Sequence, residues 1–172
     1  MALRRASRER VTVGKAMEPT LISADDERAI RALVVRYAHA VSRADADALE
    51  STWAANCHFE LAGTTGDGKV MEGRDVVVGY QREHMGWYES LVQMVGEGLI
   101  WSTSEGVEGR WTVWEVGRWA GSATDRMGVV AYADRYVHED GRWVIASRRL
   151  TVHYDNRGLP TGTFVALQPL PF

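Results

Sequence analysis

The amino-acid sequence predicts an α+β domain in which a strongly bent, mostly antiparallel sheet is covered on one side by three N-terminal helices. Two observations support this fold class. Helical spacing of apolar residues is concentrated in the first half of the chain, whereas the second half reads as four long strands joined by short turns. Because helices close only one side of a bent sheet, a pocket is expected between the two layers.

The first helix is expected over residues 24–43. Ser23 precedes Asp26 and Glu27, a pattern typical of an N-cap followed by acidic residues in the first turn. Apolar residues then recur at spacings of three and four, which places them on one helical face. A second, shorter helix is expected over 45–54 and a third over 73–88. The apolar residues of the first helix are Ile30, Leu33, Val34, Tyr37, Ala38 and Val41.

The strands follow from alternation and turn chemistry. Residues 57–63 alternate like a strand, and the sequence TGDGK at 65–69 predicts a hairpin turn after it. Four long strands are expected at about 90–103, 107–120, 125–138 and 142–154, with Asp140-Gly141 as the tight turn before the last. We expect residues 1–20 to form a flexible arm, with either Met1 or Met17 as the natural start. Residues 21–155 would form the domain, and 156–172 an extended tail packed on the body or on a neighbouring subunit.

Composition excludes several classes of partner. The formal net charge is −3, from 20 basic and 23 acidic residues, so no basic field is available for a nucleic acid. The apolar runs are too short to span a membrane, and the N-terminus lacks the apolar core of a secretory signal. A single cysteine, Cys57, excludes an intramolecular disulfide and fits a cytoplasmic location. The five histidines form no HxxxH or HxH pair, so we expect no metal site.

Charged residues interrupt apolar rows in three strands. In the last strand, every second residue around Arg148 is apolar, and Glu115 and Asp134 hold similar positions in the two preceding strands. A charge in an apolar environment must be paired, and arginine stays protonated, so Glu115 or Asp134 should pair with Arg148. One interpretation is a structural ion pair, or rows that reach the solvent-exposed rim. The other is a hydrophobic cavity with a few convergent polar groups, typical of a small-molecule site.

The second interpretation predicts a particular geometry. Glu115 and Arg148 are predicted to lie on adjacent strands, within salt-bridge distance, and to face the concave side of the sheet. The seven tryptophans are expected to fill the core and a subunit interface, although two or three of them could instead line an aromatic or polycyclic ligand.

Three segments carry a resemblance to a known family. AIRALVVRYAHAVSRADADALESTWAANCHFEL (29–61), MEGRDVVVGY (71–80) and YADRYVHEDGRWVIASRRL (132–150) resemble the SnoaL-like branch of the nuclear transport factor 2-like superfamily. The resemblance covers about 22–155 and implies a cone-shaped α+β barrel with a deep pocket. Members include scytalone dehydratase, bile-acid 7α-dehydratase, hexachlorocyclohexane dehydrochlorinase and polyketide cyclases, most of which work without a cofactor.

The resemblance also implies roles for individual residues. Dehydratase-like members carry a tyrosine on the first helix, an acid on a central strand and an arginine on the last strand, which correspond to Tyr37, Glu115 and Arg148. Tyr132 falls at a substrate-facing position. The usual base is an aspartate on the first helix paired with a histidine at the start of the long sheet. Here Ser42 replaces the aspartate, and Met94, or Gln93 if the placement shifts by one residue, replaces the histidine.

The sequence therefore predicts a cofactor-independent enzyme of lyase, isomerase or cyclase type that lacks the usual Asp-His dyad. Its substrate would be a hydrophobic small molecule of aromatic, polyketide, terpenoid or steroid-like character. Glu115 is the expected proton-transfer group. The alternatives are a non-catalytic small-molecule binding protein of the same fold and a partner-binding module. The predicted catalytic residues are Glu115, Arg148, Tyr37 and Asp134, and the predicted substrate-binding residues are Tyr132, Met94, Trp53, Trp111, Val113, Val130 and Ser42.

A homo-oligomer is also expected, as a dimer or a trimer. The outward rows of the last three strands remain apolar, and large exposed apolar patches mark interfaces. These rows contain Trp114, Val116, Val129, Ala131, Val137, Trp143 and Ile145.

Overall fold

The structure is a computed structural model that describes residues 21–62 and 68–164. The predicted N-terminal arm, most of the predicted hairpin turn and the end of the predicted tail lie outside the described residues. Among the described residues, no helix is long and apolar enough to cross a membrane. The helices are α1 (Ala24–Ser42), α2 (Ala46–Glu50) and α3 (Arg74–Gly86), and the strands are β1 (Trp53–Ala62), β2 (Lys69–Glu72), β3 (Tyr88–Thr103), β4 (Gly106–Trp119), β5 (Asp125–Glu139) and β6 (Arg142–Leu159).

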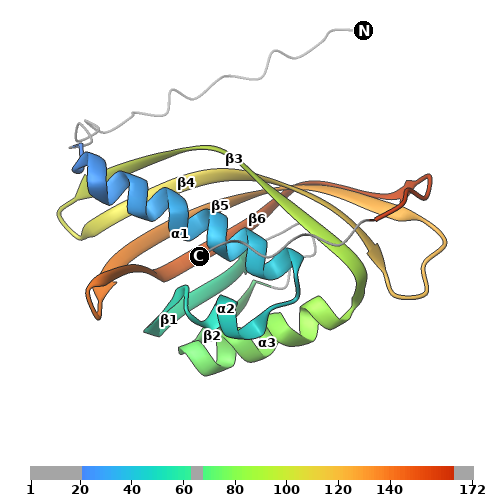
Figure 1. The fold of residues 1–172 in the computed structure, drawn as a ribbon, viewed down its shortest axis with the longest axis horizontal. Coiled ribbons are helices and arrows are strands. Elements are labelled where there is room, and N and C mark those ends of the chain that lie inside the picture. The colour runs from blue at the N-terminus through green and yellow to red at the C-terminus, as the bar shows by residue number, and fades with distance from the viewer. Residues whose placement is uncertain (1–20, 63–67, 165–172) are drawn as a thin grey trace, which may run out of the picture.

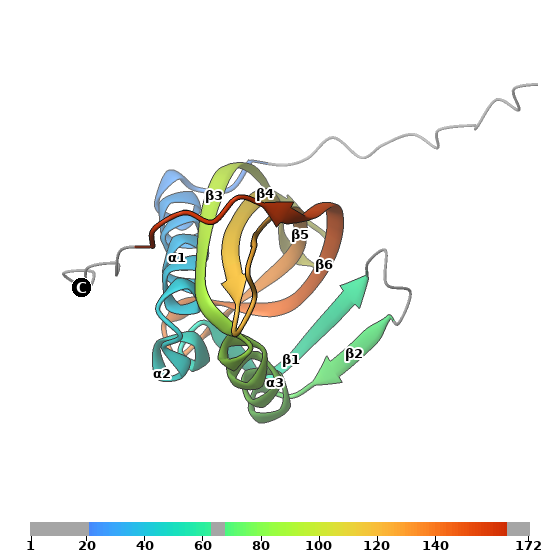
Figure 2. The ribbon, with the colours of Figure 1, turned by 90° about the vertical axis from the view of Figure 1, so that its right-hand side faces the viewer.

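All six strands belong to one mixed sheet in the order β2-β1-β6-β5-β4-β3. Strands β1 and β6 run parallel, and the other neighbouring strands run antiparallel. The sheet curls strongly but stays open, because β2 at one edge does not meet β3 at the other (Figure 2). The predicted α+β class and mostly antiparallel, bent sheet are confirmed, and the three helices lie along the concave side (Figure 1).

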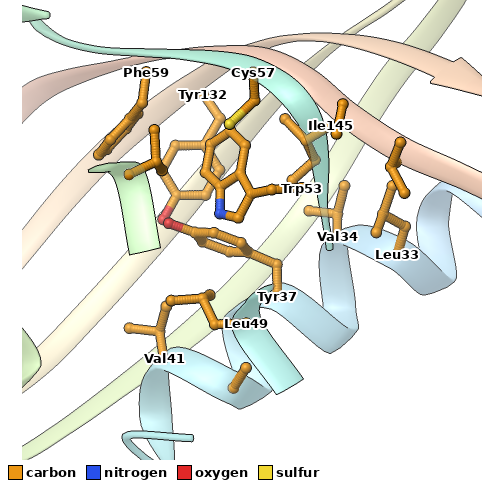
Figure 3. Packing of buried hydrophobic residues seen from close by; sticks show 14 of the residues in the cluster. Leu33, Val34, Tyr37, Val41, Leu49, Trp53, Cys57, Phe59, Tyr132 and Ile145 are labelled. Carbon is orange, nitrogen blue, oxygen red and sulfur yellow. The ribbon is translucent and has the colours of Figure 1, made fainter. Parts of the chain in front are cut away.

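Helix α1 begins where the sequence predicts. The Ser23 hydroxyl accepts a hydrogen bond from the Asp26 backbone N–H at 3.1 Å, which satisfies one of the free donors of the first turn. Its apolar face is buried against the long strands, and this contact forms much of the core (Figure 3). The helix ends at Ser42, whose side chain reaches β3: Ser42 Oγ accepts a hydrogen bond from the Gln93 backbone N–H at 2.8 Å.

A bulge in β6 corrects the predicted outward face. Tyr136 pairs with Ile145 but Arg135 pairs with Ser147, so Ala146 is the additional residue. The bulge breaks the strict alternation assumed from the sequence, because β6 then contains one residue more than β5 over the same paired stretch. Ile145 is therefore fully buried in the core, and the Trp143 indole donates to Asp26 of α1 at 2.8 Å, so neither belongs to the outer surface, contrary to the prediction.

Candidate functional site

A cavity of about 290 Å³ opens between α1, α3 and the concave face of the sheet. Its walls are mostly aromatic and aliphatic, with a small number of polar groups, as expected for a small-molecule site. The volume lies at the lower end of the range for ligand sites, so the cavity suits a molecule of one or two rings. The aromatic residues that line it are Tyr37, Phe59, Tyr80, Trp87, Tyr88 and Trp119, and the charged or amide residues and the histidine are Gln81, His84, Gln93, Glu115, Arg126, Asp155 and Arg157.

Glu115 is held in the cavity by two donors from the neighbouring strands. Gln93, directly opposite it on β3, donates from Nε2 to Glu115 Oε1 at 2.8 Å. Arg126 on β5 donates from Nη1 to Glu115 Oε2 at 3.0 Å. Gly128 is the β5 residue paired with Glu115, and a Cβ there would lie 2.8 Å from Arg126 Nη2. The missing side chain of Gly128 therefore leaves the space through which Arg126 reaches the carboxylate.

Arg126 also joins the carboxylate to the rim of the cavity. It donates to the Tyr88 hydroxyl at 2.9 Å and to Asp155 Oδ1 at 3.0 Å. Burial raises the pKa of Tyr88 above its ordinary value, so this phenol stays protonated at neutral pH. Burial opposes ionisation of Asp155, but hydrogen bonds from Arg157 and Arg126 bring the pKa of this carboxyl below its usual value. The two positive charges of Arg126 and Arg157 thus balance the two carboxylates, Glu115 and Asp155, in this network.

Tyr37 presents a hydroxyl whose hydrogen is available to a ligand. The Trp53 indole, which can only donate, bonds to Gln81 Oε1 at 3.0 Å and so fixes the orientation of that amide. Gln81 Nε2 consequently donates to the Tyr37 hydroxyl at 2.8 Å. The O–H hydrogen of Tyr37 has no acceptor among the described residues. Burial raises the pKa of Tyr37, which keeps it protonated as a hydrogen-bond donor at the cavity wall.

The predicted pairing of Arg148 with Glu115 is wrong. Strands β4 and β6 are not neighbours, since β5 lies between them. Arg148 instead pairs with Asp134, its direct cross-strand partner on β5, through two bonds of 2.8 and 2.6 Å. Tyr136 adds a hydrogen bond to Asp134 Oδ2 at 2.7 Å. Both charged side chains are fully buried and neither lines the cavity.

Aromatic rings separate Arg148 from the cavity. Its guanidinium carbon lies 4.0 Å from the ring centre of Tyr37 and 3.9 Å from that of Tyr132, so the cation is held between two π faces. Figure 3 shows the phenol groups of Tyr37 and Tyr132 side by side next to Trp53. Burial alone would lower the pKa of Arg148, but the Asp134 carboxylate raises it above the ordinary value. Arg148 is therefore a permanently charged group of the core.

Met94 and Gln93, the two residues that the resemblance suggested for the histidine position, face opposite sides of the sheet. Gln93 lines the cavity, whereas the Met94 side chain is 49% exposed and points to the outer face of the sheet. Ser42 does not line this cavity either, because its hydroxyl donates to the Ala38 carbonyl and accepts from the Gln93 backbone. Ser42 is therefore a structural residue that joins α1 to β3, whereas the Gln93 amide faces the cavity.

The other predicted residues divide into two groups. Tyr37, Glu115 and Val130 line the cavity as expected. The remaining buried residues lie behind its wall: Trp53, Trp111, Val113, Tyr132, Asp134 and Arg148.

Sequence reasoning missed five charged, amide or imidazole residues of the cavity, namely Gln81, His84, Arg126, Asp155 and Arg157. A signal existed for Gln81, which shares the buried face of α3 with Val77, Val78 and Met85. His84, four residues after Tyr80, shares a helical row with that ring. Within the described part of the chain, no three histidine, cysteine, aspartate or glutamate side chains are grouped so that they could hold a metal ion.

This combination defines a class: an open, curled α+β sheet whose helices enclose a mostly apolar cavity with a carboxylate, a phenol and an amide on its wall. The chain belongs to the SnoaL-like domain family, whose sequence profile matches residues 23–149. No curated protein matches its sequence significantly.

Solved structures with the nuclear transport factor 2-like fold superpose on most of the chain. A protein from Novosphingobium aromaticivorans named after scytalone dehydratase is 20% identical, with a TM-score of 0.68 over 82% of this chain and 96% of its own. A hexachlorocyclohexane dehydrochlorinase of the LinA type from Novosphingobium barchaimii is 16% identical, with a TM-score of 0.70 over 83% and 96%. A Streptomyces avermitilis protein named as a dehydratase of the NTF2-like family is 13% identical, with a TM-score of 0.66 over 77% and 99%.

Proposed function

We propose that the protein is a cofactor-independent lyase that eliminates water or a similar leaving group from a hydrophobic molecule of one or two rings. The observation that carries this proposal is the position of Glu115 on the wall of a mostly apolar cavity, held by Gln93 and Arg126. The dehydratase and dehydrochlorinase names of the structural neighbours support the same reaction class.

The cavity provides the groups that an elimination requires. A proton must leave carbon, and the departing oxygen or halogen must be stabilised as negative charge develops on it. Proton transfer would depend on Glu115, while the free O–H hydrogen of Tyr37 would bond to the leaving group. The aromatic walls would exclude water and hold the ring in one orientation. The cavity volume favours aromatic or alicyclic substrates over a steroid.

The second candidate is a small-molecule binding protein without catalytic activity. The observation in its favour is that Ser42 and Gln93 occupy the position where the resemblance places the Asp-His base, and neither side chain can take up a proton near neutral pH. A binding protein would retain the cavity and its aromatic lining but would release its ligand unchanged.

The test uses cyclic molecules that carry a hydrogen on the carbon next to a hydroxyl or chloride, with hexachlorocyclohexane as the halogenated member. Mass spectrometry would follow the loss of water or hydrogen chloride. For the molecule converted, Glu115→Gln should lower the rate by about a hundredfold or more. Ser42→Ala and the outward-facing Met94→Leu should retain nearly full activity. Full activity in Glu115→Gln would contradict the acid–base role, and binding of these molecules without turnover would favour the second candidate.

A further inference from the structure

His84 lies in the same cavity as Glu115, inside a cluster of aromatic rings. Its imidazole stacks on Tyr80 with ring centres 6.0 Å apart and an interplanar angle of 19°. Edge contacts surround the rest of the ring, with centre distances of 5.1 Å to Trp87, 5.3 Å to Tyr88 and 6.2 Å to Trp119. All four aromatic residues also line the cavity. The rings fix the plane of the imidazole, and the cavity leaves it accessible to a ligand.

Neither ring nitrogen of His84 has a hydrogen-bond partner among the described residues, and the residue is partly buried. A neutral imidazole carries one N–H donor and one lone pair, and both are left for a ligand in the cavity. Burial lowers the pKa of His84 below its ordinary value; the charge of Glu115 opposes this shift and the charge of Arg126 adds to it. The ring is therefore neutral at neutral pH, with a lone pair directed to no protein donor in the described chain.

We propose that His84 is the catalytic base of this cavity and that Glu115 stabilises the imidazolium that forms. The inference rests on the proposed elimination reaction. The substrate C–H bond breaks and its proton moves to the free nitrogen of His84. The electron pair left on carbon forms the C=C bond as the adjacent carbon–leaving-group bond breaks, and the leaving group departs with that bond's electrons, hydrogen-bonded to Tyr37.

The contacts of Glu115 favour this division of roles. Both of its oxygens already accept hydrogen bonds, one from Gln93 and one from Arg126, so its geometry suits a fixed negative charge better than a mobile proton acceptor. An anion near the imidazole becomes more favourable when the ring takes up a proton. The ionisable groups that line the cavity together with His84 are Tyr37 on α1, Tyr80 on α3, Tyr88 on β3, Glu115 on β4, Arg126 on β5, and Asp155 and Arg157 on β6.

A chromogenic nitrobenzisoxazole tests the inference without the natural substrate. A base removes its one acidic C–H proton, the electron pair completes a nitrile, and the N–O bond breaks to release a coloured phenolate. The full chain, His84→Gln, Glu115→Gln and a control, His153→Gln, would be compared across pH. His153 is exposed and does not line the cavity. Nuclear magnetic resonance would follow the imidazole titrations of the same proteins, with His84→Gln identifying the signal that is lost.

His84→Gln should lower the rate by about a hundredfold and abolish its fall at acidic pH, while His153→Gln should match the unmodified chain. The rate of Glu115→Gln should still fall at acidic pH. Both this fall and the His84 titration should move to lower pH, because the stabilising anion is gone. If His84→Gln kept the rate and the pH profile of the full chain while Glu115→Gln lost both the rate and the profile, the inference would be overturned. The proposed function would remain intact. The double variant, which carries both His84→Gln and Glu115→Gln, gives the background rate, and a full chain no faster than this variant would overturn both proposals.

Discussion

The buried pair of Arg148 and Asp134 lies where water cannot compensate either charge. Taking two such ions out of water costs several kcal/mol per ion, and only good geometry and further hydrogen bonds offset this cost. Here two parallel bonds join the ions, Tyr136 donates to the carboxylate, and two phenol rings face the guanidinium. The net stabilisation by the pair is expected to be small, whereas the cost of breaking it is large.

Removing one partner should therefore destabilise the fold strongly. Arg148→Met leaves the Asp134 anion buried and alone, and Asp134→Asn leaves the cation, so each should lower the free energy of unfolding by roughly 3–5 kcal/mol. The double variant should be less destabilised than the sum of the two, as urea unfolding would measure. Arg28→Met, which removes an exposed ion pair with Asp25, is the control and should change little. Additive losses in the double variant would contradict the pairing.

At the residue scale, the sequence predicted that Arg148 is buried and must have an acidic partner, because an arginine interrupted an apolar row. It offered Glu115 and Asp134 as partners, and the more specific prediction chose Glu115, which is the wrong one. Alternation indicates which residues share a face, but the order of strands in a sheet depends on the whole fold, and β5 separates β4 from β6. Arg126 was missed for a related reason: it lies near the start of β5, where a charge resembles a residue of the solvent-exposed rim, and only Gly128 brings it to Glu115.

At the element scale, β3 contains a bulge that depends on a glycine. The pairing of β3 with β4 shifts between Val95 and Gly98, and Gly98 then lies opposite Trp111. A Cβ on Gly98 would overlap the indole of Trp111. The indole cannot move away easily, because its N–H donates to the Tyr136 hydroxyl at 2.7 Å and so belongs to the network around Asp134.

Gly98→Ala should consequently lower the free energy of unfolding by about 1–3 kcal/mol, the usual cost of overpacking a core. Gly79→Ala is a matched control on the exposed side of α3, where an added Cβ meets no atom within 4 Å. That change should stabilise the protein by about 0.5–1 kcal/mol, since alanine favours a helix. Thermal unfolding of both variants measures the difference. Equal thermal unfolding midpoints for the two variants would show that the Trp111 side chain can move to accommodate the added methyl group.

Most elements were predictable because their periodicity is strong. The expected helices at 24–43 and 73–88 correspond to α1 and α3, and the four long strands agree with β3 to β6 within a few residues, apart from the longer end of β6. The errors in assigning inward and outward faces come from shifts of one residue. Ala146 reverses the faces of β6 at Ile145, and an uncertainty of one residue on β3 exchanges Gln93 for Met94. A single extra residue exchanges inward and outward side chains, and alternation alone does not locate it.

At the scale of the whole molecule, the outer face of the sheet carries large apolar side chains in register. Met94, Trp114, Val129 and Tyr154 follow one another across β3, β4, β5 and β6. Met94 is 49% exposed, Trp114 46% and Tyr154 44%. We propose that a second copy of the chain covers this row, because an exposed apolar face can pair with itself about a two-fold axis.

Light scattering at micromolar concentration should then give about twice the chain mass of 19.2 kDa. Trp114→Arg places a charge in the centre of the row and should yield the single-chain mass with unchanged secondary structure. Val76→Arg, on the exposed side of α3, is the control and should leave the assembly intact. A single-chain mass for the unmodified protein would contradict the proposal, and three times the chain mass would indicate a trimer.

The parallel pairing of β1 with β6 has a consequence for the order in which the molecule can be made. Among the described strands, β1 is the first to leave the ribosome and its partner β6 is the last, and β2 pairs with no strand other than β1. Until synthesis passes β6, the nascent β1–β2 hairpin has an unpaired edge and the β3–β4–β5 meander has another. Closing such a distant contact is slow, and exposed edges favour aggregation in the meantime. We therefore expect the chain to depend on chaperones during translation more than its size suggests, and to fold only after its final strand has been released.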